Sequence, residues 1–130
     1  MSWIDNNNML LSQKSLDYLW EKQRIISENI ANIDTPGYKS KQISFENELS
    51  SKLAKFKNIE NPKASDIRDA ILDTNVKIDV SEEESNRLDG NNVNLDVEQV
   101  ELSRAQLQYQ YHVFQINDQF SRIRSAIGKG

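Results

Sequence analysis

The chain has 130 residues, with 16 lysines and arginines, 20 aspartates and glutamates, no cysteine and a formal net charge of −4. This length allows at most one small domain, and a hydrophobic fraction of 37% argues against a large self-sufficient core. The charge excludes a basic nucleic-acid surface and a polybasic lipid-binding patch, so we expect neither partner. The absence of cysteine excludes disulfides and thiolate metal sites.

Charge divides the chain into three segments. Residues 1–43 and 93–130 each carry equal numbers of acids and bases, whereas residues 44–92 carry eleven acids and seven bases. The sequence therefore predicts two neutral, apolar-patterned ends around an acidic, weakly structured middle. The sequence contains no run of about 18 apolar residues, so we predict no membrane-spanning helix. The first residues also lack the basic and apolar regions of a cleaved secretory signal.

Residues 9–33 have the pattern of one long helix. Eight positions spaced alternately three and four apart form a mostly apolar seam: Met9, Ser12, Leu16, Leu19, Gln23, Ile26, Ile30 and Ile33. Residues 6–8 are all asparagine and offer a cap at the start. The helix should end near Ile33 or Asp34, because Thr35 precedes a proline. Pro36 and Gly37 then suit a type II turn.

Residues 44–92 show no sustained periodicity. Val76, Ile78 and Val80 alternate with polar residues and predict one short strand. We interpret the segment as a mobile or small β-containing insert that joins two helices.

Residues 94–127 predict a second, longer helix, which Asn94 or Asp96 can cap. The second helix would be about 50 Å long and the first about 37 Å long. Both are too long for a compact sphere of this chain length. The predicted fold is therefore mainly α: long N- and C-terminal helices in an elongated, antiparallel, coiled-coil-like hairpin, with a partly irregular middle that contains a small β element.

The second helix carries two seams about 160° apart. The first is Leu95, Gln99, Leu102, Gln106, Tyr109, Val113, Ile116, Phe120, Ile123 and Ile127; the second is Val93, Val97, Val100, Leu107, Tyr111 and Phe114. One antiparallel partner helix can cover only one seam. Either the middle segment or other chains must cover the other, because soluble monomers avoid large bare apolar patches.

The residues that carry most enzyme chemistry are missing or isolated. His112 is the one histidine, and packing or surface exposure explains it better than catalysis. The acidic run at residues 82–84 suits a solvated surface better than a cation site. Residues 89–94 resemble a calcium loop superficially, but Val93 occupies a ligand position and Gly90 comes too early. We therefore predict no enzyme activity, no metal and no cofactor.

Two stretches together resemble the bacterial flagellar rod and hook proteins. The first is Asn29-Ile30-Ala31-Asn32-Ile33-Asp34-Thr35-Pro36-Gly37-Tyr38-Lys39, which ends a long N-terminal helix in that family, and residues 42–45 continue the likeness. The second is Asp89-Gly90-Asn91-Asn92-Val93-Asn94-Leu95-Asp96, which looks more specifically like the proximal rod members. Glu28 and Ile33 depart modestly from the family pattern, in which smaller or apolar residues are more usual.

The resemblance implies a structural subunit of the proximal rod, the drive shaft that transmits torque in the flagellar basal body. It implies assembly with copies of the same chain, with other rod proteins, with the rod-base adaptor protein and with the membrane (MS) ring. It further implies unfolded export through the flagellar type III apparatus without a cleaved signal. The ends would be unstructured in the monomer, and the periplasmic rod would be the final location.

The resemblance also implies roles for individual residues. The assembly interface would use Leu16, Leu19, Ile26, Ile30, Ile33, Leu95, Leu102, Tyr109, Val113, Ile116, Phe120 and Ile123. The signature turn would use Asn29, Ala31, Asn32, Thr35, Pro36, Gly37 and Tyr38, with small Ala31 allowing close helix approach and Tyr38 as an anchor. For Asn29 and Asn32, bonding across an interface and capping of the helix end both remain open. The rival hypothesis is a helical-hairpin adaptor or secretion chaperone that binds a client helix.

Overall fold

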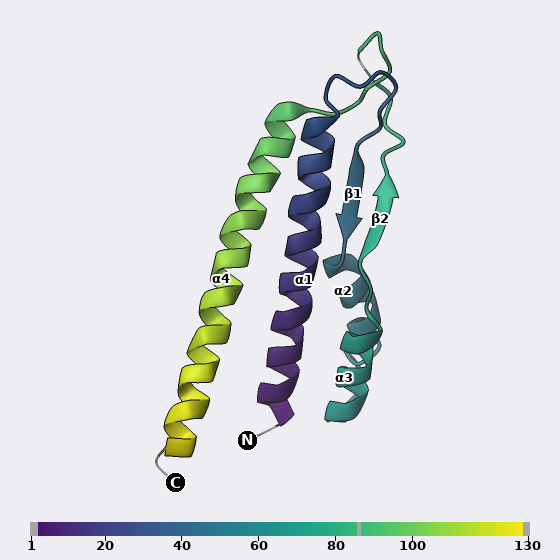
Figure 1. Cartoon of the computed structure of the whole chain (residues 1–130). Helices are drawn as coiled ribbons and strands as arrows, with labels where there is room; N and C mark the ends of the chain where they lie inside the picture. Colours follow the sequence, from purple (N-terminus) through teal and green to yellow (C-terminus); the bar gives the residue numbers. More distant parts are fainter. Residues whose placement is uncertain (1–2, 86, 129–130) are drawn as a thin grey trace.

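The computed structural model describes residues 3–85 and 87–128 of the chain. Its elements in order are α1 (Trp3–Ala31), β1 (Lys41–Ser44), α2 (Glu46–Ala54), α3 (Ala64–Asp73), β2 (Lys77–Val80) and α4 (Leu95–Gly128). The two long helices α1 and α4 lie side by side and antiparallel (Figure 1). The predicted mainly α hairpin with a small β element is therefore confirmed.

The first helix is the central element of the molecule. It packs against α4 on one side and against β1 and α3 on the other (Figure 1). It begins at Trp3, six residues earlier than predicted, so the prediction that residues 6–8 cap its start is wrong. None of residues 3–8 is glycine or proline, so nothing in that stretch breaks the helix. The helix ends at Ala31, two residues before predicted Ile33.

The core lies where α1, α4 and the chain after β1 meet. Tyr18 stacks on Phe45 with ring centroids 5.3 Å apart, and Leu19 and Ala105 complete the cluster. Ile25 and Ile26 are also buried, farther along α1. Each large apolar side chain buried in this way contributes about 1.5–3 kcal/mol to folding.

The middle segment forms an antiparallel two-stranded sheet and two short helices. Strands β1 and β2 pair with Lys41 opposite Val80 and Ser44 opposite Lys77. The predicted strand is confirmed as β2, whereas β1, α2 and α3 were not predicted. Because this segment packs on α1, it leaves the second seam uncovered from Val97 to Phe114, and only Val93, just before α4, is buried. The alternative in which the middle segment covers that seam is therefore wrong.

The last helix begins within one residue of its predicted start. Asn94 caps it: its side-chain Oδ1 accepts a hydrogen bond from the Val97 N–H at 3.3 Å, and its carbonyl accepts one from the Glu98 N–H at 3.0 Å. In the described part of the chain, no helix combines the length and the apolar character needed to cross a membrane.

Candidate assembly interface

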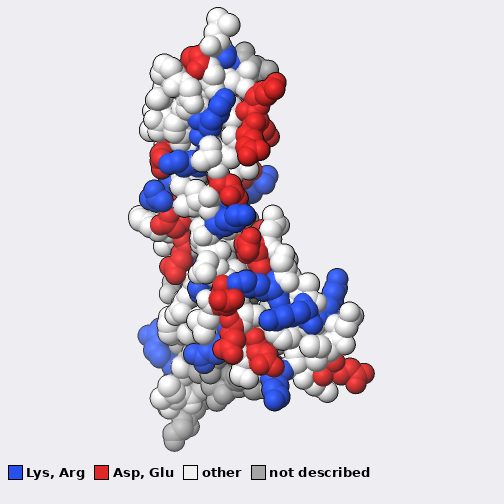
Figure 2. All heavy atoms as spheres, turned by 90° about the vertical axis from the view of Figure 1, so that its right-hand side faces the viewer, with Lys and Arg blue, Asp and Glu red and all other residues white. Residues whose placement is uncertain are grey.

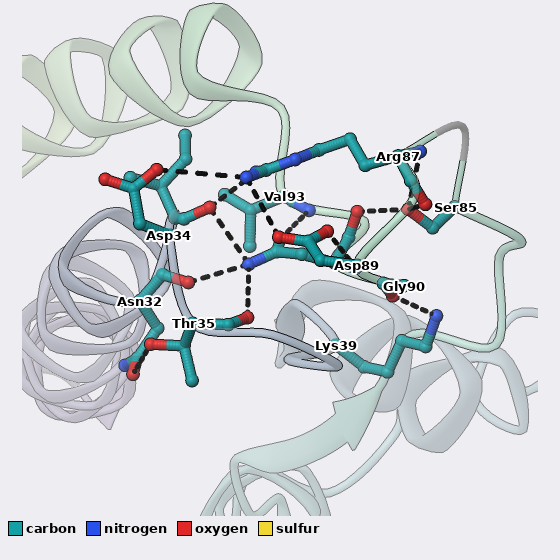
Figure 3. A network of polar contacts seen from close by, with 11 residues as sticks. Asn32, Asp34, Thr35, Lys39, Ser85, Arg87, Asp89, Gly90 and Val93 are labelled. Carbon is teal, nitrogen blue, oxygen red and sulfur yellow. Dashed lines mark hydrogen bonds and ion pairs between the residues drawn. The ribbon is translucent and has the colours of Figure 1, made fainter.

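The two stretches that resemble the rod and hook family meet at one end of the hairpin, which we call the junction end (residues 32–40 and 81–94, without residue 86). The Gly37 N–H donates to the carbonyl of Asp89 at 2.7 Å, and the Asn92 N–H donates to that of Tyr38 at 3.3 Å. Figure 3 shows side chains from both stretches converging at this point. The junction therefore fixes how the chain leaves α1 and how it enters α4.

The turn after α1 has the predicted form. The Tyr38 N–H donates to the Thr35 carbonyl at 3.2 Å, which closes a four-residue turn around Pro36 and Gly37. The φ angle of Gly37 is +73°, as the third position of a type II turn requires. A side chain at Gly37 would find open space, so backbone conformation rather than crowding selects glycine there.

Asn91 is the centre of the junction and is completely buried. Its side-chain Nδ2 donates to the carbonyls of Asn32, Ile33 and Thr35 at 2.8, 3.0 and 2.9 Å. Its Oδ1 accepts from the Val93 N–H at 2.8 Å. These carbonyls lie in the turn that follows Ala31, so one side chain holds the exit from one long helix and orients the entry to the other.

Asn29 ties α1 to β1 and α4 and is only 1% exposed. Its Oδ1 accepts from the Tyr38 hydroxyl and from the Lys41 N–H, both at 2.9 Å. Its Nδ2 donates to the Lys41 carbonyl at 2.9 Å and to Glu98 Oε2 at 3.2 Å. The predicted anchoring by Tyr38 thus acts through Asn29. Both asparagines of the turn bond within the chain, since Asn32 donates to the Glu28 carbonyl at 2.8 Å.

Charged side chains close the junction from outside. The Arg87 guanidinium donates to the Ile33 carbonyl, pairs with Asp89 at 3.2 Å and lies 3.8 Å from Asp34 (Figure 3). Lys39 donates to the Gly90 carbonyl. These contacts hold the 87–90 loop, which carries the exposed Leu88, against the end of α1.

Two carboxylates near the junction have shifted pKa values. Burial raises the pKa of Glu98, although the hydrogen bond from Asn29 opposes this. On the surface, the hydrogen bond from Lys41 lowers the pKa of Glu28. The carboxylate inside the hairpin therefore carries a desolvation cost that Asn29 partly offsets.

Away from the junction, α4 exposes an apolar face that is interrupted by Arg104. We call this the outer stripe: Val97, Val100, Leu107, Tyr111 and Phe114, each more than half exposed. These positions are spaced three, seven, four and three residues apart, so they lie on one side of the helix. Arg104 fills the gap in the spacing and pairs with Glu101 at 3.2 Å. Single exposed apolar residues are ordinary, but a contiguous patch marks an interaction surface.

Comparisons with known proteins find similarity to part of the junction and to most of the chain. A family model described as "Flagella basal body rod protein" matches residues 21–39, which end α1 and include the turn. The chain is 37% identical to Flagellar basal body rod protein FlgB of Bacillus subtilis (strain 168) over 84% of each chain. It is 33% identical to the protein of that name from Buchnera aphidicola subsp. Acyrthosiphon pisum, over 85% of this chain and 86% of the relative. The Escherichia coli (strain K12) FlgB is 25% identical over 91% of each chain.

The chain belongs to the family of flagellar basal body rod proteins. The resemblance to flagellar rod proteins is confirmed. Membership makes the protein a structural component of the rod and places it in the flagellar basal body with other rod components. The family is not an enzyme family. In the described residues, no three histidines, cysteines or carboxylates gather at a spacing that could hold a metal ion.

The predicted interface residues of α1 lie mostly inside this rod protein. Leu19 and Ile26 are buried, whereas Leu16, Ile30 and Ile33 are half-buried. Ala31 is exposed, and the residue that permits close contact between the long helices is Ala105, which is fully buried. The seam pattern missed Tyr18 and Ile25, which are buried although they lie outside the predicted spacing. Tyr18 packs on Phe45, just after β1, as well as in the cluster with Ala105.

The face of α4 that meets α1 differs from the predicted first seam. One of its two columns of residues lies one position earlier in the sequence than predicted. Four of the ten predicted seam positions are shared: Leu102, Tyr109, Ile116 and Ile123 are half-buried. The other column of that face consists of Glu98, Ala105, His112 and Gln119, each one residue before a predicted seam position. Consequently Leu95, Val113 and Phe120 remain exposed, and their contact with neighbouring subunits stays a prediction.

Proposed function

We propose that the chain is a subunit of the proximal rod that assembles with its own copies and with other rod proteins through α1 and α4, and that transmits torque through these packed helices. The outer stripe of α4 is the observation that carries the proposal. Leu107, Tyr111 and Phe114 are 67%, 60% and 71% exposed, and no segment of the described chain covers them. On α1, Trp20 is also exposed.

The further partners follow from a position at the base of the rod. They are the rod-base adaptor protein, the membrane (MS) ring and the flagellar type III export apparatus, through which the chain would reach the periplasm without a cleaved signal. A narrow, mostly helical chain with its apolar surface on one long helix suits export before final packing, because helices gain most of their stability from partners.

A charge in the outer stripe tests the proposal. Phe114→Asp or Leu107→Asp should abolish swimming and incorporation into isolated basal bodies, because a buried, unpaired carboxylate costs several kcal/mol. The free energy of unfolding should change by no more than about 0.5 kcal/mol, as for other exposed positions. Export of the variant should persist.

Gln106→Asp is the matched control, since Gln106 is exposed on the same helix but on another side from the stripe. This variant should swim and assemble normally. Normal swimming of Phe114→Asp would refute the stripe as an interface. A secretion chaperone would instead leave the unmodified protein in the cytoplasm with a client and absent from basal bodies.

A further inference from the structure

The two-stranded sheet of the middle segment has one open edge. Strand β1 lies between α1 and β2 (Figure 1), and in the described part of the chain no strand pairs with the far edge of β2. All four residues of β2 are exposed, whereas Ile43 on β1 packs against the core cluster. The sheet is therefore held by the hairpin on one side and unpartnered on the other.

The backbone at this edge has unpaired donors and acceptors. Lys41 bonds to α1 through its N–H and its carbonyl, so Val80, which lies opposite it, also turns its backbone groups away from the partner strand. The Ser81 N–H donates to the Ser40 carbonyl at 2.8 Å, as this alternation requires. Ile78, two residues before Val80, faces outward in the same way. Two residues thus present two N–H and two C=O groups that no strand of the described chain pairs.

Apolar side chains at the same edge are left partly bare. Side chains alternate between the faces of a strand, so Ile78 and Val80 lie on the same face as Ile43, the face that packs toward the core. Ile78 is 44% exposed and Val80 is 57% exposed. A third strand beside β2 would cover both and extend the apolar face that β1 begins.

We propose that the free edge of β2 binds an extended segment of another basal-body protein, which adds a third strand to the sheet. An extended chain is the ligand whose N–H and C=O groups repeat at the spacing of those of Ile78 and Val80. The inference goes beyond the proposed function but rests on it for the class of partner, because only a subunit held in the basal body meets the other proteins there.

The side chains of β2 define the segment that fits. It needs apolar residues beside Ile78 and Val80, and on the other face an acidic residue opposite Lys77 and a basic residue opposite Asp79, because opposite charges stabilise cross-strand pairs. Lys77 and Asp79 lie 3.9 Å apart and are each more than half exposed, so both can reach a partner. Figure 2 views the molecule from this side and shows basic and acidic side chains interspersed over much of it. Mixed charge suits such matched pairing and gives no field of one sign that would attract a nucleic acid.

A second copy of β2 is a poorer occupant. Two β2 strands could pair antiparallel, with Lys77 of each opposite Asp79 of the other, but that contact is two-fold symmetric and closes as a dimer. Because β2 runs along the hairpin (Figure 1), the pairing would also orient the two copies in opposite directions. Subunits of a shaft share one direction, so the added strand comes from a different chain.

Residue-resolved hydrogen exchange tests the pairing directly. In the dilute chain, β1 should protect the amides of Lys77, Asp79 and Ser81, whereas those of Ile78 and Val80 should exchange freely. In isolated basal bodies, the amides of Ile78 and Val80 should exchange at least about tenfold more slowly, since a paired strand must open before exchange. A concentrated solution of the purified chain should leave both amides freely exchanging. Protection in that sample would make a second copy the occupant and would overturn the inference.

Two substitutions at Val80 block the added strand in different ways. Val80→Pro removes only an outward N–H, which an edge strand tolerates. Val80→Glu places a charge at the edge, which opposes pairing with another chain, while Lys41 faces the new carboxylate across the sheet. Each variant should keep the urea midpoint of the unmodified chain but should enter basal bodies about tenfold less, since it loses the bonds and the apolar cover of the added strand. Val80→Ile keeps both the N–H and the apolar side chain, so this matched control should enter basal bodies normally.

The outcomes separate this contact from the proposed function. If the unmodified chain enters basal bodies and the amides of Ile78 and Val80 still exchange freely there, the added strand is wrong and the rod function stands. The same conclusion follows if Val80→Pro and Val80→Glu enter basal bodies as well as Val80→Ile does. If the unmodified chain is absent from basal bodies, the proposed function fails, and this inference fails with it.

Discussion

Asparagine is the residue type on which the junction depends. Asn29 and Asn91 are buried, and each uses its amide both to donate and to accept. An aspartate could not donate to the carbonyls at the end of α1, and glutamine would need more space and more side-chain ordering. Because all the bonds of Asn91 named above, and two of those of Asn29, involve backbone groups, these side chains fix the path of the chain.

Replacing Asn91 should destabilise the fold more than an ordinary surface change. In Asn91→Ala, three carbonyls and the Val93 N–H lose a buried partner, which predicts a loss of about 2–4 kcal/mol in the free energy of unfolding. Asn91→Asp keeps the acceptor for Val93 but brings a carboxylate against three carbonyls, so it should be at least as damaging. Urea unfolding followed by circular dichroism measures both.

Asn75→Ala is the control for these variants, because Asn75 is exposed between α3 and β2. It should change the free energy of unfolding by less than about 0.5 kcal/mol. Equal midpoints for Asn91→Ala and Asn75→Ala would show that the junction contributes little to stability.

The long helices could be predicted because their apolar spacing persists over many turns and because Pro36 and Gly37 end the first one. The contact face of α4 could not, since its apolar residues serve two surfaces and the pattern does not say which one meets α1. Two polar residues of that face, His112 and Gln119, carry no apolar signal at all. Small Ala105, rather than a large side chain, decides where the helices approach.

The shorter elements and the clamp by Asn91 escaped prediction for different reasons. α2 and α3 have nine and ten residues, too few for a sustained period, and α3 buries only Ala70 and Ile71. Strand β1 depends on a partner more than 30 residues away. The motif around Asn91 was visible, but its partners are backbone carbonyls 56 to 59 residues earlier, and backbone groups leave no pattern in the sequence.

Close packing of α1 on α4 predicts that Ala105 cannot be enlarged. Ala105 is fully buried against Tyr18 and Leu19, so Ala105→Leu should overpack the contact and lower the free energy of unfolding by about 1–3 kcal/mol. Gln106→Leu places a leucine at the next position, which is exposed. This variant should change the free energy of unfolding by less than about 0.5 kcal/mol. Thermal melts of both variants measure this difference. If Ala105→Leu melted at the same temperature as the unmodified protein, the contact at Ala105 would not be tight.

Stability is distributed unevenly along the whole hairpin. The junction end contains the buried Asn91 and the capped start of α4, and the Lys22–Glu101 ion pair at 3.4 Å and then the packed cluster around Tyr18 follow along the hairpin. Beyond Ala105, no described residue of α4 is fully buried. His112 Nδ1 and Gln119 Oε1 are buried there without partners among the described residues. The two ends of the molecule therefore differ in how much they need other subunits.

This gradient predicts how the dilute protein exchanges its amide hydrogens. Amides of residues 95–105 should be protected, whereas those of residues 112–128 should exchange much faster. That part of α4 packs only half-buried side chains against α1, and a weakly packed helix is marginal in water. Incorporation into a rod should protect the second group if neighbouring subunits cover its exposed apolar residues Val113, Phe114 and Phe120. Peptide-resolved hydrogen exchange on the dilute chain and on isolated basal bodies measures both states. Uniform protection of α4 in the dilute chain would contradict the gradient and would favour a self-sufficient adaptor or chaperone over a rod subunit that completes its fold on assembly.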